Sequence, residues 1–197
     1  MDLLYSPAAD RNKQAIYDVL KNYICSKSYL LEIASGTGQH AEYVCSRVAD
    51  LTWQPTDIET DRIKSIDLRA EQANLKNIRK AQILDVLNAW PQDTYNFIFC
   101  ANMVHISPFV TTPALFEGAN EVLNSDGIIF LYGPFFEKDV EPASSNIAFD
   151  RDLRARNSEW GIRNKESIED YAKKSNFNLI ARHEMPANNL LLVFKKN

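Results

Sequence analysis

The chain has few of the residues that build metal centres, disulfide frameworks or tight turns. Its 197 residues include three cysteines, three histidines and six glycines. Cys25, Cys45 and Cys100 form no Cys-x-x-Cys pair, so we expect reduced thiols rather than a disulfide framework. The histidines show no paired spacing, which predicts a protein without a metal site.

Long apolar runs and a basic excess are also missing. No segment has the roughly 20 consecutive apolar residues of a membrane span, and the N-terminal residues lack the apolar core of a secretory signal. The formal net charge of −4 argues against a general nucleic-acid surface. We therefore expect a cytoplasmic protein that binds a small molecule and has neither a membrane nor a nucleic-acid partner.

Strand and helix patterns alternate along the chain. Apolar runs bounded by turn residues predict seven strands, at 28–34, 51–57, 80–86, 95–103, 128–133, 177–185 and 190–196. Helical spacing and capping signals predict helices at 11–24, 39–49, 61–70, 112–123 and 165–175. Together they predict one α/β domain over residues 1–197. Its Rossmann-like, doubly wound, seven-stranded sheet is mostly parallel, with an antiparallel last strand.

The first strand runs into a glycine turn in the stretch LEIASGTGQHA, residues 31–41. Such a turn typically brings the backbone close to a nucleotide, although Gly36 and Gly38 are also compatible with a plain tight connection. In a parallel sheet these ligands bind beyond the carboxyl ends of the strands. That rule selects the residues that follow the strands and the last turn: Asp57, Asp85, Asn102, Met103, Asn188 and Asn189.

The acids at the strand ends indicate which nucleotide binds. Asp57 follows Gly38 by about 20 positions, where an acid accepts hydrogen bonds from a ribose diol, and Asp85 suits an adenine amino group. Glu32 lies beneath the turn, where it disfavours the pyrophosphate of NAD but suits the ammonium and sulfonium groups of S-adenosylmethionine (SAM). These features favour SAM, while Asp57 or Asp85 taken alone could also be a helix cap or a loop acid.

Several longer motifs resemble one known family. They are SPAADRNK, LEIASGTGQHA, WQPTD, MVHISP, YGPF, SNIAFDRDLRARNSEWGIR and MPANNLLLVF. Together they resemble, over nearly the whole chain, the methyltransferase-like protein 26 family, also described as domain of unknown function 938, which looks like class I SAM-dependent methyltransferases. The resemblance implies SAM contacts by Glu32, Ala34, Gly36 and Gly38, by Asp57 at the ribose, by Asp85 and Val86 at the adenine, and by Asn102 and Met103 beside the methionine part.

A base is needed for methyl transfer only if the nucleophile arrives protonated. His105, just after the fourth predicted strand, is the catalytic candidate, with a packing or capping role as the alternative. Residues 134–163 form a connection longer than the elements need, and we interpret them as a substrate lid whose arginines favour an anionic substrate. The alternative is a short surface helix with solvated arginines. The predicted substrate contacts are Asn146, Arg154, Trp160, Asn188 and Asn189.

The sequence thus predicts a SAM-dependent methyltransferase that acts on a small molecule. Two alternatives stay open. One is an NAD-dependent oxidoreductase, which the charge of Glu32 disfavours. The other is a SAM-binding regulatory protein without catalysis, because the motifs do not identify a catalytic base.

Overall fold

The computed structural model describes residues 3–25 and 27–197; residues 1, 2 and 26 of the predicted domain lie outside the described residues. The helices are α1 (Pro7–Leu20), α2 (Gln39–Cys45), α3 (Thr60–Gln72), α4 (Thr111–Val122), α5 (Ser144–Arg156), α6 (Lys165–Lys174) and the 3-10 turn η1 (Pro186–Asn188). The strands are β1 (Ser28–Ile33), β2 (Leu51–Asp57), β3 (Gln82–Ile83), β4 (Tyr95–Ala101), β5 (Leu123–Gly133), β6 (Phe135–Phe136), β7 (Arg163–Asn164), β8 (Phe177–Met185) and β9 (Asn189–Lys196).

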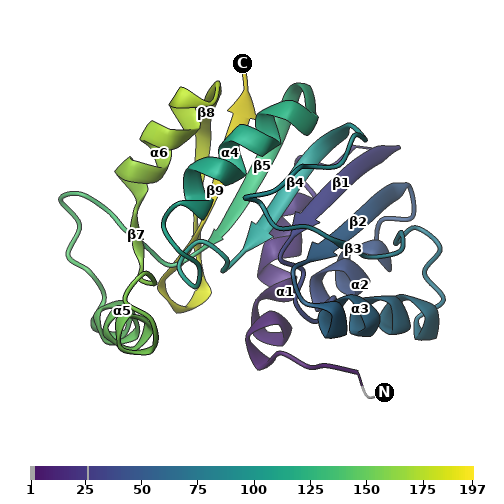
Figure 1. Cartoon of the computed structure of the whole chain (residues 1–197), viewed down its shortest axis with the longest axis horizontal. Helices are drawn as coiled ribbons and strands as arrows, with labels where there is room; N and C mark the ends of the chain where they lie inside the picture. The colour runs from purple at the N-terminus through teal and green to yellow at the C-terminus, as the bar shows by residue number, and fades with distance from the viewer. Residues whose placement is uncertain (1–2, 26) are drawn as a thin grey trace.

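Seven strands form one sheet in the order β3-β2-β1-β4-β5-β9-β8 (Figure 1). The pairs among β1 to β5 are parallel, whereas β9 runs antiparallel to both of its neighbours, β5 and β8. The last strand therefore inserts between β5 and β8 rather than forming the edge. This topology confirms the predicted Rossmann-like sheet with an antiparallel last strand.

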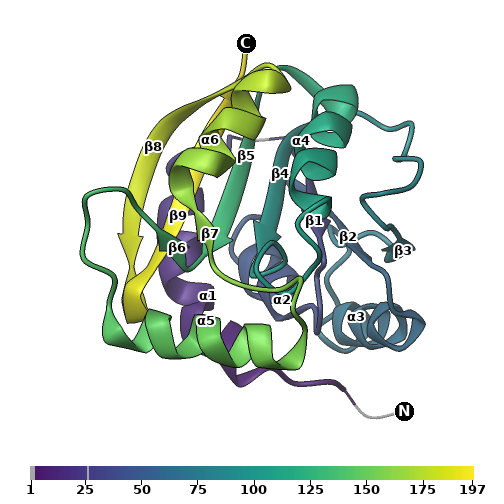
Figure 2. The same cartoon turned by 60° about the vertical axis from the view of Figure 1, so that its left-hand side comes forward.

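Helices cover both faces of the sheet (Figures 1 and 2). On one face α1 and α2 pack on a core that includes Leu20, Val44 and Trp53. On the other face α4 and α6 pack on a second core that includes Phe116 and Ile168. None of the helices among the described residues is long and apolar enough to cross a membrane.

Several predicted elements have different bounds in the structure. α2 ends at Cys45 rather than at residue 49, and β5 begins at Leu123 rather than at residue 128. α1 begins at Pro7 rather than at residue 11, because the Ser6 side chain accepts from the Ala9 N–H at 3.2 Å and a proline fits the first helical position. β3 contains only Gln82 and Ile83 of the predicted 80–86. It lies at the sheet edge and pairs with β2 alone, so no second neighbour extends its ladder.

Residues 134–163 contain a helix, as the alternative interpretation of this segment expected, and two short strands that the sequence pattern did not predict. α5 lies in this segment, and β6 and β7 pair in parallel as a separate two-stranded sheet. The buried residues of α5 are only Asn146 and Leu153. The helix therefore lacks the apolar stripe on which helix prediction depends.

Candidate active site

The parallel strands end at one edge of the sheet, and the predicted site residues follow them there. Figure 1 shows β1, β4 and β5 pointing toward this edge, and Figure 2 shows α5 lying across it below β8 and β9. Two residues that directly follow strands have left-handed backbone conformations: Ala34 after β1 (φ 54°) and Asn102 after β4 (φ 62°). Such conformations concentrate at functional sites because they cost free energy.

The glycine turn combines one packed glycine with one open glycine. Gly36 and Gly38 have φ values of 60° and 76°, a region that favours glycine. A Cβ added to Gly38 would lie 3.2 Å from the Ile66 side chain, so Gly38 allows α3 to pack closely. A Cβ added to Gly36 would meet no described atom within 4 Å, which leaves space for a ligand against the backbone.

Two hydrogen bonds join the glycine turn to the end of β2. The backbone N–H of Ser35 donates to Thr56 O at 2.8 Å, and the Thr56 N–H donates to Ser35 Oγ at 3.1 Å. These bonds hold the turn that contains Ala34. They explain how the chain keeps alanine in a backbone conformation that costs a non-glycine residue about 1–2 kcal/mol.

Asp57 lies beneath the same turn. Its carboxylate is 1% exposed and accepts from the N–H groups of Gly36 at 2.9 Å and Glu59 at 3.1 Å. The Arg62 guanidinium lies 3.6 Å from Oδ2. A carboxylate offers about four acceptor positions, so two positions remain for further hydrogen bonds. The ribose contact of Asp57 stays a prediction.

Glu32 is part of a buried polar network that sequence reasoning missed. Its carboxylate accepts from Trp53 Nε1 at 2.9 Å and lies 3.7 Å from His40 Nδ1. His40 Nε2 in turn lies 2.8 Å from Asn12 Oδ1 in α1. All four side chains are buried. The network links the acid at the end of β1 to α2 through His40 and to α1 through Asn12. His40 and Asn12 are far apart in sequence, and no spacing rule links them.

The ends of β2 and β3 present apolar surface beside the acids. Asp85 is half-buried and accepts from the Leu87 N–H at 3.0 Å, and Val86 is buried. Ile58, Ile83 and Leu87 remain exposed, at 64%, 59% and 49%. Exposed apolar side chains that follow strand-end acids suit a flat ring. Ile58 could have been found from its place directly after Asp57.

His105 and Asn102 meet Gly133 where β4 and β5 end. The position of a Cβ on Gly133 lies 3.2 Å from His105 Nδ1 and 3.7 Å from Asn102 Oδ1. His105 is 2% exposed, and its Nδ1 has no hydrogen-bond partner within residues 3–25 and 27–197. Burial, and then the positive charge of Arg163, lower the pKa of His105 to about 4. The ring is therefore neutral at pH 7 and has a nitrogen able to accept a proton.

α5 covers His105 and is hydrogen-bonded to the turn between β8 and β9. The Phe149 ring makes an edge contact with the His105 ring, with centroids 5.7 Å apart. Asn146 Nδ2 donates to Asn188 O, and Asn188 Nδ2 donates to Ser145 Oγ, both at 3.0 Å. Residues 134–163 therefore lie over the end of β4, as a substrate lid requires, and their role as a lid stays a prediction.

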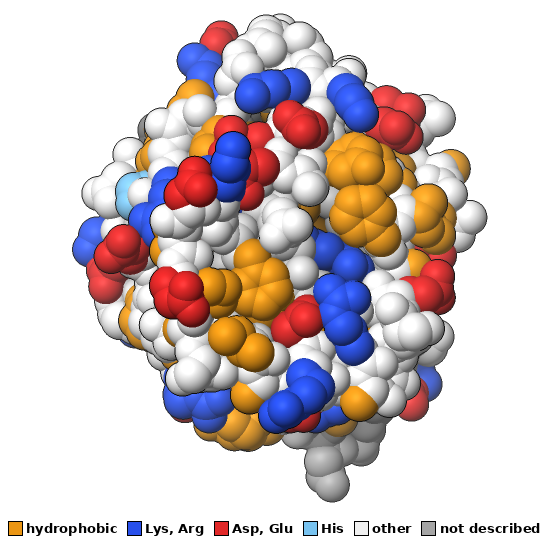
Figure 3. All heavy atoms as spheres, turned by 90° about the vertical axis from the view of Figure 1, so that its left-hand side faces the viewer, with side chains coloured by type: hydrophobic (Ala, Val, Ile, Leu, Met, Phe, Trp, Pro, Cys, Tyr) orange, Lys and Arg blue, Asp and Glu red, His pale blue; other side chains and the backbone are white. Residues whose placement is uncertain are grey.

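A cavity of about 270 Å³ brings together Asn146, Asn188 and Asn189, three of the five predicted substrate residues. Figure 3 views the face on which it lies, where apolar, acidic and basic side chains are mixed. Arg154 and Trp160 do not line this cavity. Arg154 is half-exposed and donates to Asp150 at 2.8 Å. The charge of the cavity comes from other residues: Glu137, Glu141, Arg182 and Glu184.

Met103 and the cysteines have ordinary environments. Met103 is partly buried and packs against the core that contains Phe116. Cys45 and Cys100 are buried, Cys25 is exposed, and all three are free thiols. No group of three or more metal-binding side chains occurs in the described part of the chain.

A family model described as "protein of unknown function (DUF938)" matches residues 4–196 of the chain. Solved structures share the fold at low identity. An O-methyltransferase family 2 protein from Planctomyces limnophilus, solved with apigenin, has a TM-score of 0.84 at 16% identity, and the match covers 96% of this chain and 58% of that one. The SAM-dependent methyltransferase SibL has a TM-score of 0.81 at 12% identity, covering 96% and 55%.

An O-methyltransferase family protein from Burkholderia thailandensis is a third example, with a TM-score of 0.79 at 14% identity, covering 96% of this chain and 57% of that one. The chain thus spans little more than half the length of these structures. At these identities the similarity establishes the fold.

Proposed function

This chain belongs to the family of proteins of unknown function DUF938, and we propose that it is a SAM-dependent methyltransferase acting on a small molecule. The observation that carries the proposal is the meeting of three features at one sheet edge. They are the open glycine turn, the Asp57 carboxylate that accepts from the Gly36 N–H, and the His105 imidazole, whose Nδ1 has no hydrogen-bond partner in the described part of the chain. Support also comes from SibL, a protein of the same fold that is described as SAM-dependent.

The residues around the turn fit SAM. Gly36 leaves room for a ligand, and Asp57 retains acceptor positions for the two ribose hydroxyls. Asp85 and Val86 would face the adenine, with exposed Ile58 and Leu87 offering apolar contact. The remaining contacts would come from Ala34, Gly38, Asn102 and Met103. When bound, SAM supplies an electrophilic methyl group.

Glu32 would act from beneath the turn. Its buried negative charge is held by Trp53 and His40, and a buried carboxylate near the glycine turn favours an ammonium group over a phosphate. This charge, and the methyltransferases of the same fold, leave the NAD-dependent oxidoreductase without support. The proposal therefore keeps SAM as the cofactor.

His105 would serve as the general base. Because its ring is buried and neutral, a nitrogen lone pair can take the proton that an acceptor hydroxyl, amine or thiol loses as its new bond to carbon forms. Phe149 covers the ring and would exclude water from it. The protein's own work is then to bind, orient and deprotonate the acceptor.

The cavity beside α5 would receive part of the acceptor. Arg182 is its only cationic lining residue among the described residues. It donates from Nε and Nη2 to Glu137, at 2.8 and 2.7 Å, and from Nη1 to Glu184 at 3.1 Å. With Glu141 and Glu184 also present, the cavity carries excess negative charge. In place of the anionic substrate that the arginines of the sequence favoured, we therefore propose an uncharged or cationic acceptor, held also by Asn146, Asn188 and Asn189.

Methyl transfer from isotopically labelled SAM into fractionated small-molecule extracts tests the proposal. We expect labelled product with the natural protein and a loss of labelling in His105→Gln, which keeps polarity but not basicity. A protein that binds SAM yet labels no fraction would contradict catalysis and support the SAM-binding regulatory alternative.

A further inference from the structure

Arg163 is a buried cation that is not neutralised by an ion pair. It is 8% exposed, and within residues 3–25 and 27–197 no carboxylate lies within 4.0 Å of its guanidinium. Burial is costly for a charge unless specific partners compensate for it. The hydrogen-bond partners of Arg163 are all backbone carbonyls. This pattern indicates that its side chain fixes the position of nearby backbone.

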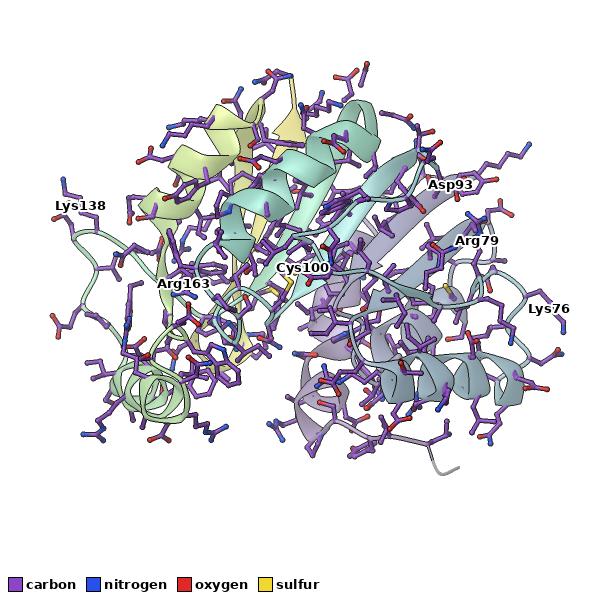
Figure 4. The ribbon with its side chains drawn as sticks, in the orientation of Figure 1. Lys76, Arg79, Asp93, Cys100, Lys138 and Arg163 are labelled. Atoms are coloured by element: carbon purple, nitrogen blue, oxygen red, sulfur yellow. The ribbon has the colours of Figure 1, made fainter. Side chains whose placement is uncertain are left out.

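Those carbonyls belong mainly to the turn that carries His105. Arg163 Nε donates to Val104 O at 2.9 Å, and Nη2 donates to Ser107 O at 2.7 Å. A third bond, from Nη2 to Glu159 O at 3.1 Å, joins the chain segment that leaves α5. The charged guanidinium makes stronger hydrogen bonds than a neutral donor would. Figure 4 shows Arg163 between α5 and the N-terminal end of α4.

The segment that contains Arg163 also bonds to His105 itself. The N–H of Gly161 donates to His105 O at 3.0 Å, and the Arg163 guanidinium stacks over Phe109, 5.2 Å from the ring centroid. The backbone is thus held on both sides of the imidazole. β7 begins at Arg163 and pairs with β6. Because β6 follows β5 in the chain after one residue, the backbone of Arg163 is linked to the end of the main sheet.

We propose that Arg163 is a positioning residue for His105, holding the 104–107 backbone so that the imidazole stays between Gly133 and Phe149. This inference rests on the proposed function, because a positioned base matters only if His105 accepts a proton. It adds a residue that neither the glycine motif nor the strand-end rule selects.

The guanidinium also shapes the electrostatics of the ring. Its positive charge lowers the pKa of His105 in addition to burial. The other charged groups near the guanidinium are Arg154 and Asp150 of α5, which pair with each other. Arg163 would thus fix the place of the base and also keep it unprotonated.

Two substitutions separate these effects. Arg163→Lys keeps the positive charge but cannot reach several carbonyls with a planar fork. Arg163→Gln removes the charge and keeps a shorter donor. The matched control is Arg156→Gln at the exposed end of α5, where Arg156 makes no ion pair in the described part of the chain.

The first measurement needs no methyl acceptor: the His105 imidazole is followed by ¹⁵N NMR through a pH titration. We expect the pKa of His105 to rise in Arg163→Gln and to stay low in Arg163→Lys, with altered ring shifts in both. Melting with and without S-adenosylhomocysteine confirms folding and cofactor binding. Unchanged His105 shifts and pKa in folded Arg163→Gln would overturn the proposal, whether or not the protein proves to be a methyltransferase.

The second measurement is methyl transfer to the acceptor identified with labelled SAM. Both Arg163 variants should lose about 10- to 100-fold in kcat, since small displacements of a reacting group cost that much, while KM for SAM changes less than about twofold. A third variant, Arg163→Ala, tests rescue: guanidinium added to the solution should partly restore its kcat. A parallel loss of cofactor binding and stability, without rescue, would show a merely structural role and overturn the proposal.

Discussion

Gly133 and His105 are in contact where β5 and β4 end, with the position of a Gly133 Cβ 3.2 Å from both Cε1 and Nδ1 of the imidazole. The backbone of Gly133 does not have a positive φ, so alanine is conformationally acceptable there. An added methyl group would therefore act on the ring and not on the strand. Gly133 has no side chain because the imidazole occupies that space.

Gly133→Ala should reduce methyl transfer while leaving SAM affinity unchanged. The methyl group must push the imidazole by a few tenths of an ångström, which we expect to lower kcat by about tenfold. Calorimetric titration gives the affinity, and labelled transfer gives kcat. In a His105→Gln background the same substitution should have no further effect; an equal loss in both backgrounds would show that Gly133 does not act through His105.

Asp57→Asn should weaken SAM binding by at least about tenfold, since hydrogen bonds to a charged group are worth about 1.5–3 kcal/mol and those to a neutral one about 1 kcal/mol. The amide keeps the shape and one acceptor oxygen for Gly36. Glu59→Gln, at a half-exposed acid that pairs with Arg62, is the control and should bind normally. Calorimetric titration showing natural affinity in folded Asp57→Asn would remove Asp57 from the cofactor site.

S-adenosylhomocysteine or SAM at a hundred times its dissociation constant should stabilise the fold by about 2.7 kcal/mol. For a chain of this size that raises the melting temperature by roughly 5–11 °C. NAD and NADP at equal concentration should shift it little, because their pyrophosphate would face Glu32. Glu32→Gln keeps an acceptor for Trp53 and should reduce the SAM shift. A clear NAD shift with none from SAM would contradict the proposed function.

The stability of the protein should fall on acidification because of His105. Its folded pKa of about 4 lies below its ordinary value of 6.5, so the unfolded chain binds the proton first. The stabilisation is fully present above pH 6.5 and is lost as the pH falls toward 4, about 3 kcal/mol in all. Urea unfolding between pH 4 and 8 measures it. His105→Gln should lack this component, and His183→Gln, at a half-buried histidine, should retain it.

The local pattern of the sequence determined the sheet. Alternation of apolar strands with helices and a short turn before the last strand were enough to predict seven strands with an antiparallel β9. The rule that parallel strands end at one edge then selected the glycine turn, Asp57, Asp85, Asn102 and Met103 as candidates for the cofactor site. The prediction of the sheet is confirmed because it depends on residues close together in the chain, where spacing reflects backbone geometry. The roles of the site residues stay predictions.

Only the tertiary structure decided how the side chains at that edge are partnered. The contacts of His40 with Asn12, of Phe149 with His105 and of Arg163 with Val104 all join segments that are far apart in sequence. The charge of the cavity beside α5 was also decided there, because its acids come from β8 and the 135–143 loop. Such contacts depend on how whole elements pack, and packing leaves no periodic trace in any one segment.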